Sequence, residues 1–255
     1  MWGQVLSESF EDISQLPARG WVQANTSSPV GPVSWFQGNP EVMPPRTAPG
    51  YIAANFWCAG DASGADAGRS AWLIMPPLLI ANGDAVTFWT CCAGGIHADR
   101  LQIRASANGS STDVGQDPDS VGDFNLLLLD LNPQMNCRDY PIEWTRCVAT
   151  LSGLPPGRAL GRIAFRYYLP AQAQAPGNYI GIDNVQVDSG PPPRCYPNCD
   201  GSTTAPLLNI SDFTCFLHHF SWGDPYANCD GSTVSPVLNV NDFVCFIQRY
   251  SEGCL

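Results

Sequence analysis

The C-terminal part of the chain contains a tandem repeat, and this repeat limits the structures that the chain can form. Residues 198–203 (NCDGST) return 30 positions later as residues 228–233, and residues 208–213 (LNISDF) return as residues 238–243 (LNVNDF). Such a repeat indicates two copies of one supersecondary unit. Each copy ends with apolar residues at helical spacing, so we expect two loop-helix units. The apolar residues are Phe213, Phe216, Leu217 and Phe220 in the first copy, and Phe243, Phe246, Ile247 and Tyr250 in the second.

The loop of each copy is rich in side-chain oxygens, which are the ligands that Ca²⁺ prefers. Two of the acids follow the loop in the first turn of the expected helix, where the helix dipole favours a negative charge. We therefore predict one calcium ion in each loop. The alternative is that these residues only form turns. The predicted ligands are Asn198, Asp200, Ser202, Asn209 and Asp212 in the first copy, and Asn228, Asp230, Ser232, Asn239 and Asp242 in the second.

This pattern resembles the dockerin family, and in particular the cysteine-containing dockerin-like repeats of certain environmental bacteria. The resemblance implies two calcium loops that each lead into a helix, and a cohesin-like or other cell-surface protein as the docking partner. The loops depart from the family pattern, because residues 198–212 span 15 positions where such a loop has about 12. The first ligand is also Asn instead of Asp. With two carboxylates in each loop, we expect a Kd of about 10⁻⁴ to 10⁻³ M.

Cysteine is abundant, with 11 residues in a chain of 255. So many cysteines in a chain with few charges and many turns indicate disulfides, and therefore an oxidising compartment. We expect a secreted protein, located outside the cell or on its surface. In the C-terminal part a symmetric scheme pairs Cys199 with Cys215, Cys229 with Cys245, and Cys195 with Cys254, which is one of several possible connectivities.

The cysteines allow a metal-site interpretation in the C-terminal part and further disulfides in the rest of the chain. In the C-terminal part, a zinc site is an alternative to the disulfides, with ligands from Cys195, Cys199, His218 and His219. In the rest of the chain, one alternative is a redox pair formed by Cys91 and Cys92. Because neighbouring cysteines more often bond elsewhere, we expect disulfides such as one between Cys58 and either of these two, and one between Cys137 and Cys147.

Residues 5–188 alternate polar and apolar side chains, which is typical of half-buried strands. Strands are expected over 85–90, 100–106, 123–131, 161–168 and 179–187, separated by Gly, Pro, Asn and Asp clusters. Three consecutive prolines at 191–193 indicate a stiff spacer. We therefore expect a mainly β fold: an antiparallel jelly-roll β-sandwich over 1–188, a Pro-rich linker over 189–194, and a small α-helical, dockerin-like module with two calcium loop-helix repeats over 195–255.

Four segments of the body occur in a characteristic order: residues 8–11 (ESFE), 17–21, 70–76 (SAWLIMP) and 181–187 (GIDNVQV). Together they resemble the choice-of-anchor J or cleaved-adhesin group of bacterial surface domains, which are jelly rolls. The resemblance implies a second calcium site, formed by Glu11 on the first strand and Asp183 on the last. The alternation of the last strand slips by one residue at Asp183-Asn184, which predicts a bulge beside this acid. The alternative is an ordinary edge bulge with solvated acids.

Tryptophans of the body are candidates to stack on sugar rings. Trp72 lies in an apolar run and is expected to be buried. Trp35 and Trp57 lie in loop-like segments, and they are our candidates for exposed residues that contact a polysaccharide ligand.

Composition and motifs exclude several functions. The net charge is −11 and all 12 basic residues are Arg, a balance opposite to that of nucleic-acid-binding proteins. No apolar stretch approaches the roughly 20 residues that span a bilayer. We find no metalloprotease, serine hydrolase or phosphate-loop motif, nor the acidic residues on one strand that a jelly-roll glycosidase would need, so we predict no enzymatic activity.

The sequence therefore predicts a secreted, non-catalytic adhesion or binding protein. Its body would bind a ligand, and its calcium-stabilised C-terminal module would dock or sort the protein. The alternative is a carbohydrate-binding module, or an accessory protein of polysaccharide degradation, that the same C-terminal module targets.

Overall fold

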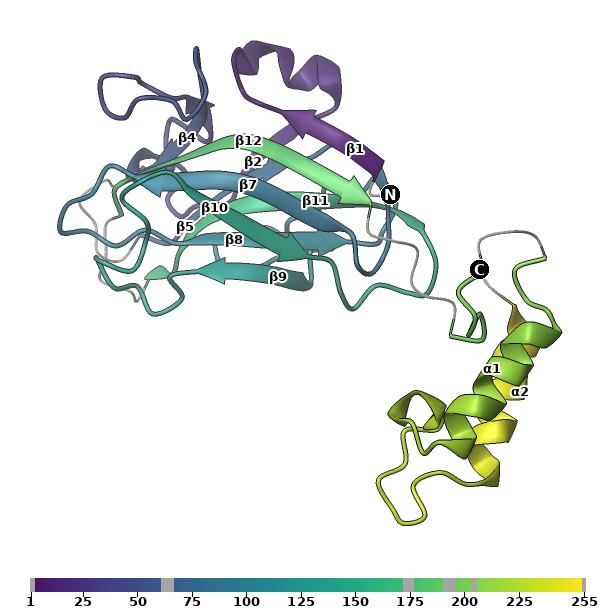
Figure 1. Ribbon diagram of the computed structural model, residues 1–255. Coiled ribbons are helices and arrows are strands. Elements are labelled where there is room, and N and C mark those ends of the chain that lie inside the picture. The colour runs from purple at the N-terminus through teal and green to yellow at the C-terminus, as the bar shows by residue number, and fades with distance from the viewer. Residues whose placement is uncertain (1–2, 61–66, 172–176, 190–195, 203–205, 254–255) are drawn as a thin grey trace. The chain divides into compact units, whose positions relative to one another are not determined.

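The computed structural model describes residues 3–60, 67–171, 177–189, 196–202 and 206–253 (Figure 1). The chain divides into two compact units, Met1–Gly190 and Pro191–Leu255, which we call the sandwich unit and the helical unit. Of the predicted linker 189–194, only Ser189 lies within the described residues, and it is the last residue of a strand.

The sandwich unit consists of two antiparallel sheets that pack face to face (Figure 1). The first sheet has the strand order β10-β7-β12-β4-β3, and β1 also pairs with β12. Its strands are β1 (Gly3–Glu8), β3 (Phe36–Gln37), β4 (Ile52–Asn55), β7 (Ala85–Cys92), β10 (Thr145–Thr150) and β12 (Tyr179–Ser189).

The second sheet has the strand order β2-β5-β11-β8-β9, and β6 pairs with β11. Its strands are β2 (Val22–Asn25), β5 (Arg69–Ile74), β6 (Leu78–Ile80), β8 (Leu101–Ser106), β9 (Leu126–Leu131) and β11 (Ala159–Leu169). Short 3₁₀ helices η1 (Ile13–Gln15), η2 (Pro17–Arg19) and η3 (Phe56–Cys58) lie in the connections. The predicted mainly β, antiparallel sandwich is confirmed, and β7, β8, β9, β11 and β12 all fall on segments that the alternation predicts.

The alternation of the strands determines which side chains enter the core. Leu101, Ile103 and Ala105 of β8 are all fully buried between the sheets, as period-two spacing requires. Phe88 of β7 meets Phe165 of β11 across the two sheets, with an edge-to-face arrangement and 5.1 Å between ring centroids.

The outer face of the second sheet is also covered, which the alternation did not predict. Trp72 of β5 is fully buried there, as expected for this tryptophan, against Phe124 from the loop between β8 and β9. The guanidinium of Arg166 lies 4.7 Å from the ring centroid of Trp72 and 3.9 Å from that of Tyr168. It also donates a hydrogen bond to the carbonyl oxygen of Pro118 in the same loop. Burial lowers the pKa of Arg166 to about 9.

The helical unit contains α1 (Ile210–Ser221), η5 (Pro225–Ala227) and α2 (Val240–Glu252). Each α-helix begins with a capping box. The side chain of Asn209 accepts a hydrogen bond from the first turn of α1, and Asp212 accepts one from the backbone N–H of Asn209. Asn239 and Asp242 form the same arrangement at the start of α2. The two loop-helix units predicted from the repeat are therefore present.

Equivalent residues of the two copies contact each other. Phe216 and Phe246 stack with 4.1 Å between ring centroids. Tyr196 and Tyr226 stack at 4.9 Å, and the hydroxyl of each donates a hydrogen bond to the backbone carbonyl of the other. Because each pair occupies the same place in the two copies, the helical unit has an approximate two-fold symmetry.

Two of the predicted disulfides, Cys199–Cys215 and Cys229–Cys245, are confirmed. The third, between Cys195 and Cys254, lies outside the described residues.

The disulfides expected in the sandwich unit are wrong, because Cys58, Cys91, Cys92, Cys137 and Cys147 are free thiols. Neighbouring residues of a strand point to opposite faces of the sheet. Cys92 therefore packs in the main core with Cys58, whereas Cys91 lies on the other face with its sulfur 2.9 Å from that of Met43. Cys137 is exposed in the loop before β10, and Cys147 is partly buried on that strand.

Candidate functional site

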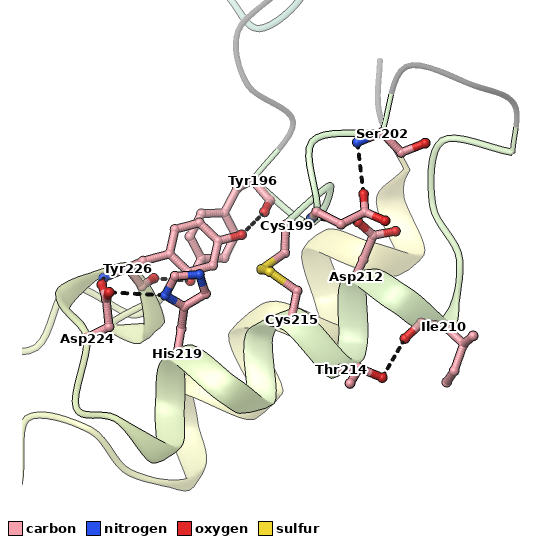
Figure 2. The surroundings of a disulfide bond; sticks show 11 residues. Tyr196, Cys199, Ser202, Ile210, Asp212, Thr214, Cys215, His219, Asp224 and Tyr226 are labelled. Atoms are coloured by element: carbon pink, nitrogen blue, oxygen red, sulfur yellow. Dashed lines mark hydrogen bonds and ion pairs between the residues drawn. A yellow bond between two sulfur atoms is a disulfide. The ribbon is translucent and has the colours of Figure 1, made fainter.

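The first loop of the helical unit folds back onto the N-terminus of α1. Asp212 is fully buried, and its two carboxylate oxygens accept hydrogen bonds from the backbone N–H groups of Asp200 (3.2 Å) and Asn209 (2.8 Å). The carboxylate of Asp200 accepts a hydrogen bond from the N–H of Ser202 at 2.8 Å. Figure 2 shows Asp212 pointing from the helix toward the loop that carries Ser202. These bonds hold both predicted acids of the loop at one end of α1.

The second loop repeats this geometry. Asp242 is fully buried and accepts hydrogen bonds from the N–H groups of Asp230 (3.3 Å) and Asn239 (2.8 Å). The carboxylate of Asp230 accepts one from the N–H of Ser232 at 2.8 Å. The two loops therefore place their acids in the same way.

Each loop also contains a buried acceptor that has no partner. The side-chain oxygens of Asn198 and Asn228 are buried, and no described residue donates a hydrogen bond to either. Their amide nitrogens donate to the carbonyls of Ser202 (2.7 Å) and Ser232 (2.9 Å), which fixes the orientation of the side chains. A buried acceptor without a partner costs about 1–3 kcal/mol. A hard cation would coordinate such an oxygen together with nearby carboxylates, so the residues present fit Ca²⁺.

The structure gives the other predicted ligands different partners. The side-chain oxygen of Asn209 accepts a hydrogen bond from the N–H of Ser211 at 2.7 Å, and that of Asn239 accepts one from the N–H of Asn241 at 2.9 Å. These two asparagines therefore cap the helices. The hydroxyl of Ser232 donates to the carbonyl of Val237 at 3.2 Å, which leaves its oxygen able to accept.

The zinc alternative is wrong for Cys199. The sulfurs of Cys199 and Cys215 and a ring nitrogen of His219 lie within 4.8 Å of one another, but the two sulfurs form a disulfide (Figure 2). Zinc binds the thiolate, which a disulfide does not provide. Nδ1 of His219 lies instead 3.1 Å from the carboxylate of Asp224. A backbone N–H from Tyr226, followed by the contact with His219, lowers the pKa of Asp224.

In the sandwich unit, Asp183 is fully buried at the predicted bulge. The pairing of β12 with β7 shifts between Asp183 and Gln186, which confirms the slip in the alternation. The carboxylate of Asp183 accepts hydrogen bonds from the N–H groups of Thr47 (2.8 Å) and Asn184 (2.7 Å). Burial, with a smaller contribution from Glu11, raises the pKa of Asp183 to about 6.

Glu11 is exposed and follows β1, so the expectation that it lies on the first strand is wrong. The structure brings Glu11 close enough to Asp183 to affect its pKa. The N–H of Thr47 was not part of the sequence prediction, because residue 47 is far from both acids along the chain. A calcium ion between Glu11 and Asp183 stays a prediction.

The two tryptophan candidates differ in exposure. Trp35 is 3% exposed and its indole N–H donates to the carbonyl of Ala71 at 3.1 Å, so the expectation that it lies exposed is wrong. Its loop-like sequence gave no sign that this side chain enters the core. Trp57 in η3 is 47% exposed and lies beside Phe56, with 5.3 Å between the ring centroids. It is still available to a ligand.

No family model matches the chain, and no curated protein matches it. The sandwich unit is similar in fold to cleaved adhesin domains of solved structure. The K1 cleaved adhesin domain of Lys-gingipain from Porphyromonas gingivalis W83 matches with a TM-score of 0.51 and 21% identity, over 74% of this chain and 100% of that domain. The K2 domain of Lys-gingipain matches with a TM-score of 0.50 and 15% identity, over 71% of this chain and 98% of that domain.

A family 11 carbohydrate-binding module from Clostridium thermocellum, solved with a mixed-linked tetrasaccharide, is a looser match. Its TM-score is 0.41 and its identity 13%, over 74% of this chain and 97% of that module. At these identities the comparisons show the fold of the sandwich unit alone. None of the helices among the described residues combines the length and apolar character needed to span a bilayer.

Proposed function

We propose that this chain is a secreted, non-catalytic binding protein, whose sandwich unit recognises a surface ligand and whose helical unit is a calcium-stabilised, dockerin-like docking or sorting module. One observation carries the proposal. Asn198 and Asn228 leave a buried oxygen without a partner at the same place in both loops. In each copy, a fully buried acid, Asp212 or Asp242, closes the same loop.

The residues of the loops have separate roles in this proposal. Asp212 and Asp242 hold the loop backbone and the start of a helix together, and the disulfides fix each loop to the next turn of its helix. Bound Ca²⁺ supplies the positive charge that the side-chain oxygens lack. Ile210 and Val240, at equivalent helix starts, are 75% and 70% exposed. Ion binding would therefore order the segment that presents these apolar side chains to a cohesin-like or other cell-surface protein.

Further features support the proposed location and the role of the sandwich unit. The two disulfides suit an oxidising, extracellular compartment. The likeness of the sandwich unit to cleaved adhesin domains supports a binding role for it.

The test is thermal unfolding of the full chain in Ca²⁺ and in chelator. With a Kd of about 10⁻⁴ M, 10 mM Ca²⁺ would stabilise the helical unit by about 2.7 kcal/mol for each site. We expect the melting temperature of the helical signal to rise by about 10 °C or more. An unchanged melting temperature would contradict the calcium assignment.

Matched variants make this test specific. Asp200 and Asp230 are exposed, so Asp200→Asn with Asp230→Asn should leave the stability in chelator nearly unchanged and remove the response to Ca²⁺. Asp117 is the control, because it also accepts backbone N–H groups in an exposed turn but lies in the sandwich unit. Asp117→Asn should keep the full response.

A polysaccharide ligand for the sandwich unit is the second candidate function. The exposure of Trp57 favours it, since an exposed indole ring can stack on a sugar. Retention of the full chain on insoluble polysaccharides, compared with that of Trp57→Ala, tests this role. Equal retention of both proteins would remove Trp57 from the ligand site.

A further inference from the structure

The sandwich unit has a cavity at the end where β7 stops and β10 and β12 begin. Figure 1 shows this end of the strands at the left. Residues 93–95, which follow β7, and residues 137–142, which precede β10, line it. We call it the tip cavity. Its volume is about 840 Å³, which lies in the range of about 300–1,000 Å³ found for small-ligand sites.

The walls of the tip cavity are fixed to the sheet and to each other. The N–H of Cys92 donates to the carbonyl of Pro141 at 2.8 Å, which ties the two walls together. The N–H of Ala93 donates to the carbonyl of Tyr179 on β12 at 3.0 Å, and the side chain of Asn178 donates to the carbonyl of Gly94. The cavity is therefore formed before a ligand arrives, which reduces the entropic cost of binding.

Glycine makes one wall out of bare backbone. Gly94 and Gly95 have φ values of +72° and +116°, a region that side chains rarely adopt. The peptide groups of this wall carry no side chains of their own; a Cβ at Gly94 would lie 3.9 Å from Cγ2 of Ile142, and one at Gly95 would lie 3.4 Å from Nδ2 of Asn178.

The opposite wall offers donors, acceptors and an apolar surface. Arg138 and Asp139 are both exposed and both line the cavity. No residue in the described part of the chain forms a hydrogen bond or ion pair with the guanidinium of Arg138, so its donors are available. Asp139 is held by the side-chain amide of Asn136 at 2.6 Å and keeps further acceptor capacity. Ile142 is 69% exposed.

A buried acid close to this end of the sandwich has an unused acceptor. One oxygen of Asp99 accepts hydrogen bonds from the hydroxyl of Tyr167 (2.7 Å) and the N–H of Asn178 (2.8 Å). Its other oxygen is buried and has no hydrogen-bond partner among the described residues. Asn178, whose N–H donates to Asp99, also donates through its side chain to the carbonyl of Gly94, so one residue connects Asp99 to the glycine wall.

The backbone of η3 is connected to the glycine wall. The N–H of Phe56 donates to the carbonyl of Asn178 at 3.1 Å, and the side chain of Asn178 in turn donates to the carbonyl of Gly94. The 3₁₀ helix that carries the exposed Trp57 is therefore two hydrogen bonds away from this wall.

We propose that the tip cavity binds a neutral, hydroxyl-rich ligand, namely a terminal pyranose of a glycan. An arginine and an aspartate side by side suit vicinal hydroxyl groups, which both donate and accept hydrogen bonds, and Ile142 suits the apolar face of the ring. The charges of Arg138 and Asp139 cancel, and a chain of net charge −11 repels anions, so a neutral sugar is favoured over an acidic one.

The inference rests on the proposed binding function of the sandwich unit. β12 begins at the tip and ends at Ser189, 11 residues later, where the chain leaves the sandwich. An 11-residue strand is about 33 Å long. The tip cavity is thus at the opposite end of β12 from Ser189.

The experiment measures binding of methyl glycosides of glucose, galactose, mannose, xylose and glucuronic acid to the full chain by saturation-transfer NMR. We expect at least one neutral glycoside to bind with a millimolar Kd. Arg138→Ala should weaken it about tenfold, because a hydrogen bond to a charged group is lost. Ile142→Ser should also weaken it. Arg146→Ala and Val148→Ser are matched controls on β10 and should bind as the wild type does.

Three results would overturn the inference: no transfer to any neutral glycoside, preferred binding of the glucuronide, or equal effects of Arg138→Ala and Arg146→Ala. All variants should keep the wild-type melting temperature, since the replaced side chains are exposed. The response of the helical unit to Ca²⁺ is measured on the same samples. Loss of glycoside binding with this response intact counts against the tip cavity alone, and a missing response counts against the proposed function.

Discussion

Replacing Cys199 and Cys215 together by serine removes the bond that joins the first loop to α1. The bond closes a loop with a sequence separation of 16. In the chain-entropy model, opening such a loop returns about 10 cal/mol/K to the unfolded chain, or about 3 kcal/mol at 25 °C. A unit as small as the helical unit has only a few kcal/mol of stability in total. We therefore expect the double variant to lose most of the stability of this unit.

Urea unfolding followed by far-ultraviolet circular dichroism measures the loss, because both α-helices of the described chain lie in the helical unit. With an m-value of about 1 kcal/mol/M, the midpoint should fall by about 3 M or the unit should be unfolded without urea. Cys229→Ser with Cys245→Ser should cost the same, since that loop also has a separation of 16. Cys137→Ser, at an exposed free thiol, is the control. A loss below about 1 kcal/mol, or a loss for one pair only, would show that the disulfides are not what stabilises the helical unit.

Three further predictions concern buried groups. Trp35→Ala should destabilise the sandwich unit by about 3–5 kcal/mol and Trp57→Ala by less than about 1 kcal/mol, measured by urea unfolding; equal effects would contradict the burial of Trp35. Burial raises the pKa of Asp99 from 3.8 to about 6, so the folded state binds more protons between these values and the free energy of unfolding should fall as the pH rises from about 4 to 6. Asp99→Asn should make the free energy of unfolding depend less steeply on pH. Some dependence should remain, because the pKa of Asp183 is also raised to about 6. An unchanged pH dependence would exclude Asp99 as a cause of it. Phe216→Ala, which removes a fully buried ring stacked on that of Phe246, should cost about 3–5 kcal/mol, and retained helical signal in moderate urea would contradict this.

The sequence predicted the features of the chain that depend on local spacing. The period of 30 residues and the apolar stripes gave both helices of the helical unit, because two equal copies must have equal local structure. The same symmetry gave the disulfides Cys199–Cys215 and Cys229–Cys245. Alternation gave β7, β8, β9, β11 and β12 of the sandwich but not its other strands, and its slip at Asp183 gave the bulge.

Features that depend on contacts between distant segments were not predictable in this way. Trp35 occurs in a loop-like segment, but its indole group reaches the carbonyl of Ala71 inside the core. Which cysteines of the sandwich unit meet depends on how distant segments pack. Cys58 and Cys92 lie in the same core, but they form no disulfide. Pattern alone does not reveal which loop covers Arg166.

In the candidate sites, too, local spacing was predictable and contacts between distant residues were not. The sequence identified the oxygen-rich loops, but not that the amides of Asn209 and Asn239 cap helices while those of Asn198 and Asn228 keep an oxygen free. The tip cavity was also missed. Its two walls are separated by more than forty residues along the chain, and neither wall carries a recognised motif.

An anomalous difference map from crystals grown in millimolar Ca²⁺ would locate the ions themselves. We expect one peak in each loop of the helical unit. The side-chain oxygen of Asn198 or Asn228 and a carboxylate oxygen from the same loop should lie about 2.3–2.6 Å from the peak, which is the length of a Ca²⁺–oxygen bond. Loops without peaks, in which both asparagine oxygens accept hydrogen bonds from water, would contradict this expectation.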